Sequence, residues 1–299
     1  MLKTETPSSN HTELDLYPVP DLISAFVEDQ IDAVKALRGA AGALAQAVEA
    51  ALPRMQDGGR LIYVGAGTSG RLGVLDSVEL HPTFSWPRER AVALLAGGAG
   101  AMFVAVEGAE DDFSQGGLDI EAVDVSPRDV VLLLAASGAT PYVMGALAAA
   151  RAAGALTIGF ANNVDAPLTQ QAHIGVLLDT GSEVISGSTR LKAGSAQKMA
   201  LNTFSSALMV RLNKVYGNLM VDVRASNAKL VRRAVALTQL ATGCSAEQAA
   251  TTLHACDQQV KVAIVALRRN IDVSAARACL EAADGSVRRA LLAELGRTA

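Results

Sequence analysis

Apolar residues follow two different spacings along this chain, and the changes between them divide it into three parts. From residue 21 to residue 52 they recur at helical intervals, which predicts one or two helices ending near Pro53. Between residues 60 and 181 they form five short runs closed by small residues or glycine, which predicts buried strands. From Gly187 onwards the helical spacing returns, with Ser, Thr or Asp at segment starts and Gly at segment ends.

The five short runs predict a parallel sheet. They read RLIYVGAG, RAVALLAGG, DVVLLLAASG, ALTIGFANN and IGVLLDTG. Because helical segments lie between them, the connections must be crossovers. We therefore predict an α/β fold with a doubly wound five-stranded parallel sheet, N-terminal helices and a small C-terminal all-helical domain. The predicted boundaries are 1–54 for the N-terminal arm and helices, 55–222 for the α/β domain and 223–299 for the helical domain.

Composition narrows the class of protein. Half of the 299 residues are hydrophobic, but no apolar run approaches the ~18 residues of a membrane span. The first twenty residues are polar and acidic, unlike a signal peptide, so we expect a cytoplasmic protein. The net charge of −4 comes from interspersed residues of both signs, so the sequence shows no cluster of basic residues of the kind that binds nucleic acid. A small-molecule partner is the favoured expectation.

Cysteine and histidine positions give no indication of a disulfide or a metal site. The cysteines are odd in number and without CxxC spacing, so we expect reduced, mostly buried thiols: Cys244, Cys256 and Cys279. The histidines lie in separate segments without metal-ligand spacing: His11, His81, His173 and His254.

The stretch YVGAGTSGR contains glycines spaced as in a dinucleotide-binding turn, at Gly65, Gly67 and Gly70. A strand precedes it and a helix can follow, so its amides could bind a phosphate. A dinucleotide site also needs an acidic residue about twenty positions later, at the end of the next strand. That strand ends in Gly97 and Gly98 instead, which disfavours a nicotinamide cofactor. A plain capped turn between strand and helix remains the structural alternative.

Two hydroxyl-rich turns favour a single phosphate group over a dinucleotide. Thr68 and Ser69 lie inside the first turn, beside Gly67. The turn AASGATP after the third strand contributes Ser137, Gly138 and Thr140. Ligands of open α/β sheets bind at the carboxyl edge, where these turns would meet. A phosphomonoester such as a sugar phosphate is the expected ligand.

Several motifs in order resemble the N-acetylmuramic acid 6-phosphate etherases, a family built on the sugar isomerase (SIS) fold. They are YVGAGTSGRLGVLDSVELHPTF, VEGAEDD, AASGATPYV, GSTRLKAGSAQKMALN, VYGNLMVDV, NAKL and ATGCSAEQA, and the resemblance runs from about Glu13 to the C-terminus. It implies a cytoplasmic homodimeric carbon–oxygen lyase without metal or nucleotide cofactor. The family cleaves the D-lactyl ether at C3 of the sugar, giving N-acetylglucosamine 6-phosphate and D-lactate, in peptidoglycan amino-sugar recycling.

The resemblance also implies two catalytic glutamates. Glu79, in SVELHP, would protonate the departing lactate oxygen, and Glu110, in EGAED, would remove the proton at C2. A structural alternative exists for each: Glu79 follows Asp76 by three residues and could belong to a solvated acidic face, and Glu110 lies in an acidic cluster suited to a helix N-terminus.

The position of Glu79 raises a geometric question. A helix starting near Thr68 would carry Glu79 about 15 Å along its axis, farther than a hexose phosphate reaches. Either Gly73 and Pro82 break or bend the helix, or Glu79 serves the site of a neighbouring subunit. We favour a site completed across a dimer interface.

The segment GSTRLKAGSAQK supplies further candidate binding residues at the start of a helix. Ser188 and Lys192 would bind the phosphate or carboxylate of the substrate, with Thr189, Arg190 and Lys198 in the same block. The alternative is a helix cap with solvated basic residues.

Departures from the family pattern lie at the rim of the expected pocket and bear on substrate range more than on the chemistry. Val78, Leu80 and His81 flank the first glutamate where the family usually has a small residue and a cysteine, and GGAGAMF has smaller residues than usual. The main alternative is a non-catalytic sugar-phosphate-binding regulator, like the related glucokinase regulatory protein. That protein is expected to carry two SIS halves in a longer chain. A sugar-phosphate isomerase is a weaker alternative.

Overall fold

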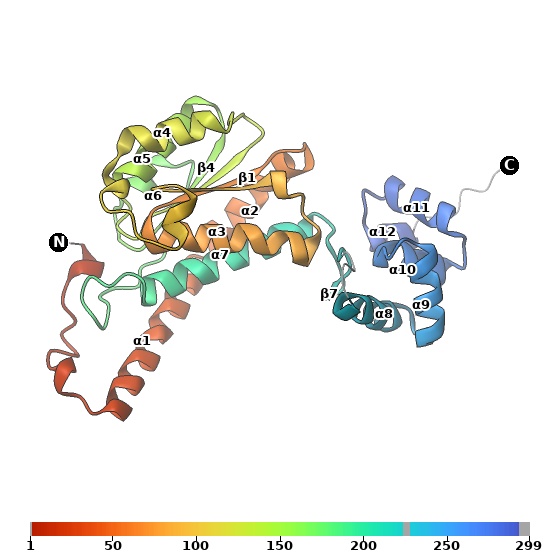
Figure 1. Ribbon diagram of the computed structural model, residues 1–299, viewed down its shortest axis with the longest axis horizontal. Coiled ribbons are helices and arrows are strands. Elements are labelled where there is room, and N and C mark those ends of the chain that lie inside the picture. The colour runs from red at the N-terminus through yellow and green to blue at the C-terminus, as the bar shows by residue number, and fades with distance from the viewer. Residues whose placement is uncertain (1, 224–227, 293–299) are drawn as a thin grey trace. The chain divides into compact units, whose positions relative to one another are not determined.

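Figure 1 shows the computed structural model of the protein, which describes residues 2–223 and 228–292. Contacts within the chain divide it into two units. One comprises the residues up to Val78 together with Arg88–Ala207, and the other comprises Glu79–Pro87 and the chain from Leu208 onwards. The division at residues 54 and 222 stays a prediction.

The first unit contains the predicted five-stranded parallel sheet. Its strands are β1 (Leu61–Gly65), β2 (Ala91–Leu95), β3 (Val130–Leu134), β4 (Leu156–Ala161) and β5 (Ile174–Leu177). They are all parallel and lie in the order β2-β1-β3-β4-β5. Each apolar run of the sequence forms one strand, and β1, β3 and β4 are buried along their whole length. The order reverses between β1 and β3, which makes that point the switch of a doubly wound sheet.

Helices cover both faces of this sheet (Figure 1). They are α1 (Val19–Gly39), α2 (Ala41–Gln56), α3 (Gly67–Phe84), α4 (Phe113–Ala122), α5 (Pro141–Ala152), α6 (Pro167–Gln171) and α7 (Lys192–Arg211). Ile62 and Val131 pack under α5 on one face. Tyr63 points to the opposite face, where its hydroxyl reaches Asp76 of α3, and Ser205 of α7 donates to the same carboxylate. The sheet is therefore sandwiched as the alternating pattern predicts.

The N-terminal segment is attached to the first unit. It contains two short 3₁₀ helices, Lys3–Glu5 and Leu14–Leu16. Thr4 is buried, and its hydroxyl accepts a hydrogen bond of 3.0 Å from the amide of Asn163, which follows β4. The main chain of Gly187 donates to the carbonyl of Thr4. The polar segment that the sequence predicts as an arm is thus fixed beside the loop that leads to α7.

The second unit is mainly helical, as predicted, and packs around one buried helix. Its helices are α8 (Ala228–Thr242), α9 (Ala246–Ala255), α10 (Val260–Arg269), α11 (Val273–Ala282) and α12 (Val287–Leu292). Ser245 and Asp272 cap α9 and α11 through their side chains. A two-stranded hairpin of β6 (Val215–Tyr216) and β7 (Leu219–Met220) was not predicted, because its strands are too short for a readable alternation. Across the described part of the chain, every helix is too short or too polar to cross a membrane.

An ion pair joins the starts of β1 and β3. Arg60 donates to Asp129 at 2.8 Å, and Asp129 is only 2% exposed. Burial by itself would raise the pKa of Asp129, but hydrogen bonds from Arg60 and Ser126 outweigh it and hold that pKa below its ordinary value. The ionised carboxylate therefore stabilises the fold above the unfolded-state pKa, and this contribution is lost as the pH falls through the lower, folded pKa.

We expect Asp129→Asn to lower the free energy of unfolding at neutral pH by about 3 kcal/mol, because Arg60 loses its charged partner. The loss relative to wild type should shrink as the pH falls through the acidic range. Urea denaturation at several pH values measures it. A difference that stays constant down to acidic pH would contradict this interpretation of Asp129.

Candidate active site

Three glycines shape the turn between β1 and α3, each for its own reason. A Cβ atom at Gly65 would lie 2.7 Å from the main chain of Gly70, and one at Gly70 would lie 2.5 Å from the carbonyl oxygen of Gly65. Gly67 has a φ of +52°, in the left-handed region that favours glycine. Strand and helix therefore approach each other closely, and the first amides of α3 come to the carboxyl edge of the sheet.

Thr68 and Ser69 lie in the first turn of α3. Ser69 is buried and Thr68 is half-buried. Their position at a helix N-terminus is typical of residues that bind a phosphate together with free main-chain amides.

The turn after β3 has its own internal hydrogen bonds. The Ser137 hydroxyl accepts from the main chain of Ala139 at 3.2 Å and lies 3.3 Å from the hydroxyl of Thr140. Gly138 has a φ of +71°, and a Cβ atom there would lie 2.3 Å from the Cβ of Ala166. Its carbonyl accepts from Leu168 of α6. The turn is thus rigid, with its hydroxyls half-buried at the start of α5.

These two turns leave the sheet side by side, because β1 and β3 are neighbours. Gly65 pairs in register with Leu134, at the carboxyl ends of both strands. The crevice at such a switch point is where open α/β sheets bind their ligands. The next strand, β2, ends at Leu95 and is followed by Ala96 and two glycines with positive φ, so no carboxylate stands where a ribose would need one.

The start of α7 lies against the first turn. A Cβ atom at Gly194 would lie 3.4 Å from the Thr68 methyl carbon, so glycine permits the close approach. Thr68 also lines a pocket of about 450 Å³ in the first unit. The residues around it come from α1, α3 and α7 with the loop before α7: Gln30, Val34, Thr68, Leu72, Arg190, Gly194, Ser195, Lys198 and Met199.

Lys192 does not line this pocket. It is 3% exposed, and its ammonium lies 2.7 Å from the Asp29 carboxylate of α1. The cations that line the pocket are Arg190 and Lys198 from the same sequence block, and both are exposed. Ser188 is half-buried in the loop before α7. That Lys192 and Ser188 bind substrate stays a prediction.

A buried carboxylate that sequence reasoning missed holds the start of α7. Glu183 is fully buried and accepts hydrogen bonds from the main-chain amides of Lys192 and Ala193, at 3.0 and 2.9 Å. Burial raises the pKa of Glu183 although these amides act in the opposite direction. Glu183 precedes the helix by nine residues, outside the three-residue spacing by which caps are recognised in a sequence.

We expect Lys192→Met to lower the free energy of unfolding by about 3 kcal/mol, because it leaves the Asp29 carboxylate, whose side chain is 12% exposed, without its partner. Lys35→Met is a matched control in α1, since the Lys35–Asp32 pair is 70% and 48% exposed and should contribute at most ~0.5 kcal/mol. Urea denaturation of both variants measures the difference. Equal losses would contradict a structural role for the Lys192–Asp29 pair.

The two candidate catalytic glutamates are both exposed. Glu110 lies in a 3₁₀ turn, Ala109–Asp111, after Gly108 in the left-handed region. Its neighbour Ala109 packs on the apolar cluster under α5, the helix that begins after Thr140. Asp112, from the same acidic cluster, caps α4 by accepting from Gln115. Glu110 is therefore not the residue that fills the generic capping role.

Glu79 lies on α3, which continues without a break from Gly67 to Phe84. Gly73 and Pro82 therefore do not interrupt it. Asp76 does not share a solvated acidic face with Glu79, because Asp76 is 5% exposed and accepts from Tyr63 at 2.8 Å and Ser205 at 3.1 Å. Glu79 itself is exposed, so its catalytic role stays a prediction. His81 has its Nδ1 2.9 Å from the carbonyl oxygen of Trp86. Within the described residues, no group of three His, Cys, Asp or Glu side chains could hold a metal ion.

The five-stranded parallel sheet with helices on both faces is that of an SIS-type α/β fold. Residues 102–207 match the SIS domain, residues 43–151 the glucokinase regulatory protein N-terminal SIS domain, and residues 217–261 the C-terminal lid domain of glucokinase regulatory protein. The fold is also similar to that of a phosphoheptose isomerase from Francisella tularensis, with a TM-score of 0.51 at 17% identity over 64% of this chain and 98% of that one.

Curated relatives narrow the family. The chain is 56% identical to the N-acetylmuramic acid 6-phosphate etherase of Deinococcus radiodurans over 97% of this chain and 95% of that protein. It is 47% identical to the etherase of Mycolicibacterium smegmatis, over 97% of both chains. It is 46% identical to that of Salmonella dublin, over 97% of this chain and 98% of that one. The chain belongs to the N-acetylmuramic acid 6-phosphate etherase family.

Proposed function

We propose that this protein cleaves the D-lactyl ether of N-acetylmuramic acid 6-phosphate, giving N-acetylglucosamine 6-phosphate and D-lactate, as a carbon–oxygen lyase of peptidoglycan amino-sugar recycling. The observation that carries the proposal is the identity of 46–56% with curated etherases over 97% of the chain. The neighbouring turns after β1 and β3 support a phosphorylated substrate.

The phosphate would be bound by the two turns at the switch point. Gly67, Thr68 and Ser69 would supply amides and hydroxyls from the start of α3. Ser137, Gly138 and Thr140 would do so from the turn before α5, and Ser188 and Lys192 would contribute from the loop and start of α7. The pairing of Lys192 with Asp29 argues for a positioning role within this set.

The ether at C3 can leave by elimination, because the open-chain sugar has an aldehyde that acidifies the proton at C2. Glu110 as base takes that proton, the C3–O bond breaks, and Glu79 as acid protonates the departing lactate oxygen. Water then adds at C3 and a proton returns to C2, which restores the sugar. No metal or nucleotide cofactor is needed for these steps.

We propose that the site is completed across a homodimer. α3 runs uninterrupted, and Glu79 lies eleven residues beyond Thr68, or about 16 Å along the axis. This is farther than one bound sugar phosphate extends from the phosphate turn. Glu79 of a neighbouring subunit could instead reach the C3 oxygen of a sugar whose phosphate is bound at Thr68. Leu75 and Val78, just before Glu79, are exposed apolar residues suited to such a contact.

The first helix offers the larger part of that interface. Its exposed apolar side chains recur every three or four residues, at exposures of 46–69%: Val19, Ile23, Val27, Ile31 and Val34. Val34 also lines the pocket beside Thr68. A second copy of the chain covering this stripe would therefore lie next to the proposed phosphate site.

We expect Ile23→Glu/Val27→Glu to convert the dimer to monomers, because two carboxylates in an apolar interface would lose their hydration. Analytical ultracentrifugation measures the mass. Val164→Glu places a charge on an equally apolar but separate surface position, 43% exposed, and should leave the mass unchanged. A double variant that remains dimeric would exclude the α1 stripe as the interface.

A cytoplasmic location and small-molecule partners complete the proposal, with no role for nucleic acid or membrane. We also propose that the chain is divided into an N-terminal arm with helices, an α/β domain and a C-terminal helical domain.

The test is incubation of the purified protein with N-acetylmuramic acid 6-phosphate, with D-lactate measured enzymatically. Release of D-lactate supports the lyase. The matches to the regulatory protein keep a second candidate, a non-catalytic sugar-phosphate binder. Saturable binding without D-lactate would favour that candidate, and isomerisation of a sugar phosphate without D-lactate would favour an isomerase.

A further inference from the structure

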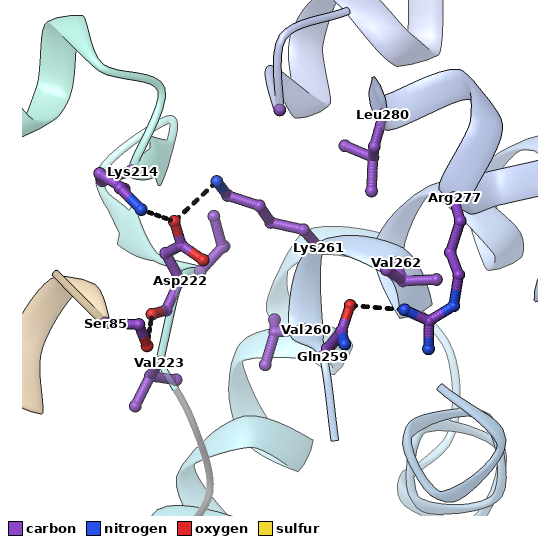
Figure 2. Close-up of a pocket in the computed structure, with 12 residues that line it drawn as sticks. Ser85, Lys214, Asp222, Val223, Gln259, Val260, Lys261, Val262, Arg277 and Leu280 are labelled. Carbon is purple, nitrogen blue, oxygen red and sulfur yellow. Dashed lines mark hydrogen bonds and ion pairs between the residues drawn. The ribbon is translucent and has the colours of Figure 1, made fainter. Parts of the chain in front are cut away.

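A second pocket lies in the helical unit. It has a volume of about 430 Å³ and is lined by residues from the loop after α3, the β6–β7 region and helices α10 and α11 (Figure 2). Three of these side chains are cationic and one is acidic: Lys214, Lys261, Arg277 and Asp222. No part of the proposed catalytic chemistry uses them.

Two ammonium groups share one carboxylate oxygen in this pocket. Lys214 lies 2.7 Å and Lys261 2.9 Å from the same Oδ2 atom of Asp222, as Figure 2 shows. The three side chains are only 13–25% exposed. Burial lowers the pKa of Lys261 although Asp222 acts in the opposite direction. One carboxylate therefore serves two half-buried cations, of which Lys214 also lies 5.9 Å from the centroid of the Trp86 ring.

The third cation, Arg277, has its ionic partner at the surface and also donates to the carbonyl oxygen of Cys256 at 3.4 Å. Arg277 donates to Gln259 at 2.9 Å and to Asp257 at 2.8 Å. The Asp257 side chain is 81% exposed, so water screens this ion pair and it contributes little. Within the lining three cations face one carboxylate, and Asp257 beside the lining compensates Arg277 only weakly. The pocket therefore favours an anionic ligand.

We propose that this pocket binds the phosphate monoester of a small metabolite, separately from the site at the sheet. A phosphate monoester carries a charge of about −1.5 to −2 near neutral pH, and Lys and Arg side chains are its usual partners. The volume lies within the range that small-molecule sites occupy and exceeds the need of a bare phosphate. Val221, Val260, Val262 and Leu280 form an apolar part of the wall for the organic portion.

Isothermal titration calorimetry of the full-length protein with N-acetylglucosamine 6-phosphate tests the proposal. We expect a second binding event per chain beyond the one at the sheet. Lys261→Gln and Arg277→Gln should each weaken that second event by about tenfold or more, and Ser137→Ala should weaken only the other. The control Arg233→Gln removes an exposed cation of α8 and should change neither. A single event in the wild type, or a second event unaffected by both pocket variants, would overturn the proposal.

Inorganic phosphate as a second titrant distinguishes an ester site from a site for the free ion. The ester should bind more tightly, because only the ester can contact the apolar wall. Equal affinities would refute a metabolite ester as the ligand.

Melting temperatures of a different variant test the pocket even if Lys261→Gln or Arg277→Gln does not fold. Asp222→Asn removes the one carboxylate, so Lys214 and Lys261 repel each other and the melting temperature should fall. Inorganic phosphate should raise the melting temperature of Asp222→Asn more than that of the wild type, because the anion takes the place of the carboxylate. Equal shifts in the two proteins would count against an anion in this pocket.

Discussion

Glu110→Gln and Glu79→Gln should each lower kcat for D-lactate release by about 10³-fold, while the substrate still binds. General acid–base catalysis contributes typically ~10²–10⁴-fold, and glutamine can neither take the C2 proton nor donate one to the lactate oxygen. Coupled D-lactate assays give kcat and KM, and titration of the inactive variants gives the affinity. Asp112→Asn is the matched control, since this carboxylate caps α4 and should alter stability more than kcat.

A mixture of the two inactive variants tests whether the site spans two subunits. In a heterodimer, one site would combine the intact Glu110 of one chain with the intact Glu79 of the other. After random subunit exchange about half of the dimers are mixed and half of their sites are intact, so about a quarter of wild-type activity should return. If each site uses its own Glu79, every site contains one defect and no activity returns. That outcome would refute the shared site but leave the lyase proposal standing.

Gly65→Ala should lower the free energy of unfolding and weaken phosphate binding. The added Cβ would lie 2.7 Å from the main chain of Gly70, so β1 and the start of α3 must move apart. We expect a loss of about 4 kcal/mol in the free energy of unfolding, at the upper end for single substitutions. The turn that presents Thr68 and Ser69 would shift with the helix, and KM should rise. Urea denaturation and steady-state kinetics measure the two effects.

Gly67→Ala is the matched control within the same turn. A Cβ atom there meets no other atom within 4 Å, so the cost is only that of the left-handed conformation, about 1 kcal/mol. If Gly65→Ala and Gly67→Ala were equally stable, the close approach of strand and helix would not be what Gly65 provides.

The sheet could be predicted because its signal is local. Each strand is a short apolar run closed by small residues, and strand–helix alternation permits few topologies other than a parallel one. The neighbouring positions of the two hydroxyl-rich turns followed from a general rule about sheet edges. The missing carboxylate after β2 was also readable, since it depends only on which residues follow one strand.

The long-range polar contacts could not be predicted. Lys192 pairs with Asp29, which lies 163 positions away in the sequence, and Glu183 caps a helix from a loop. No spacing rule connects such residues, because the tertiary fold alone brings them together. The spacing of Asp76 and Glu79 likewise suggested a shared surface face, whereas Asp76 is buried and accepts hydrogen bonds from Tyr63 and Ser205.

The candidate catalytic glutamates were selected for a different reason. Neither Glu79 nor Glu110 stands out by burial or local pattern, and both are exposed. They were selected through the resemblance to the etherase family, and their roles stay predictions. An exposed acid and base would reach a suitable environment when substrate and a second subunit cover them.

The most direct test of the account is the reaction of N-acetylmuramic acid 6-phosphate in water enriched in heavy oxygen, followed by mass spectrometry of both products. Elimination and hydration at C3 predict that the label enters the sugar and that the released D-lactate keeps its original oxygen. Label in the D-lactate with an unlabelled sugar would mean cleavage on the lactyl side of the ether, and would contradict the roles assigned to Glu79 and Glu110.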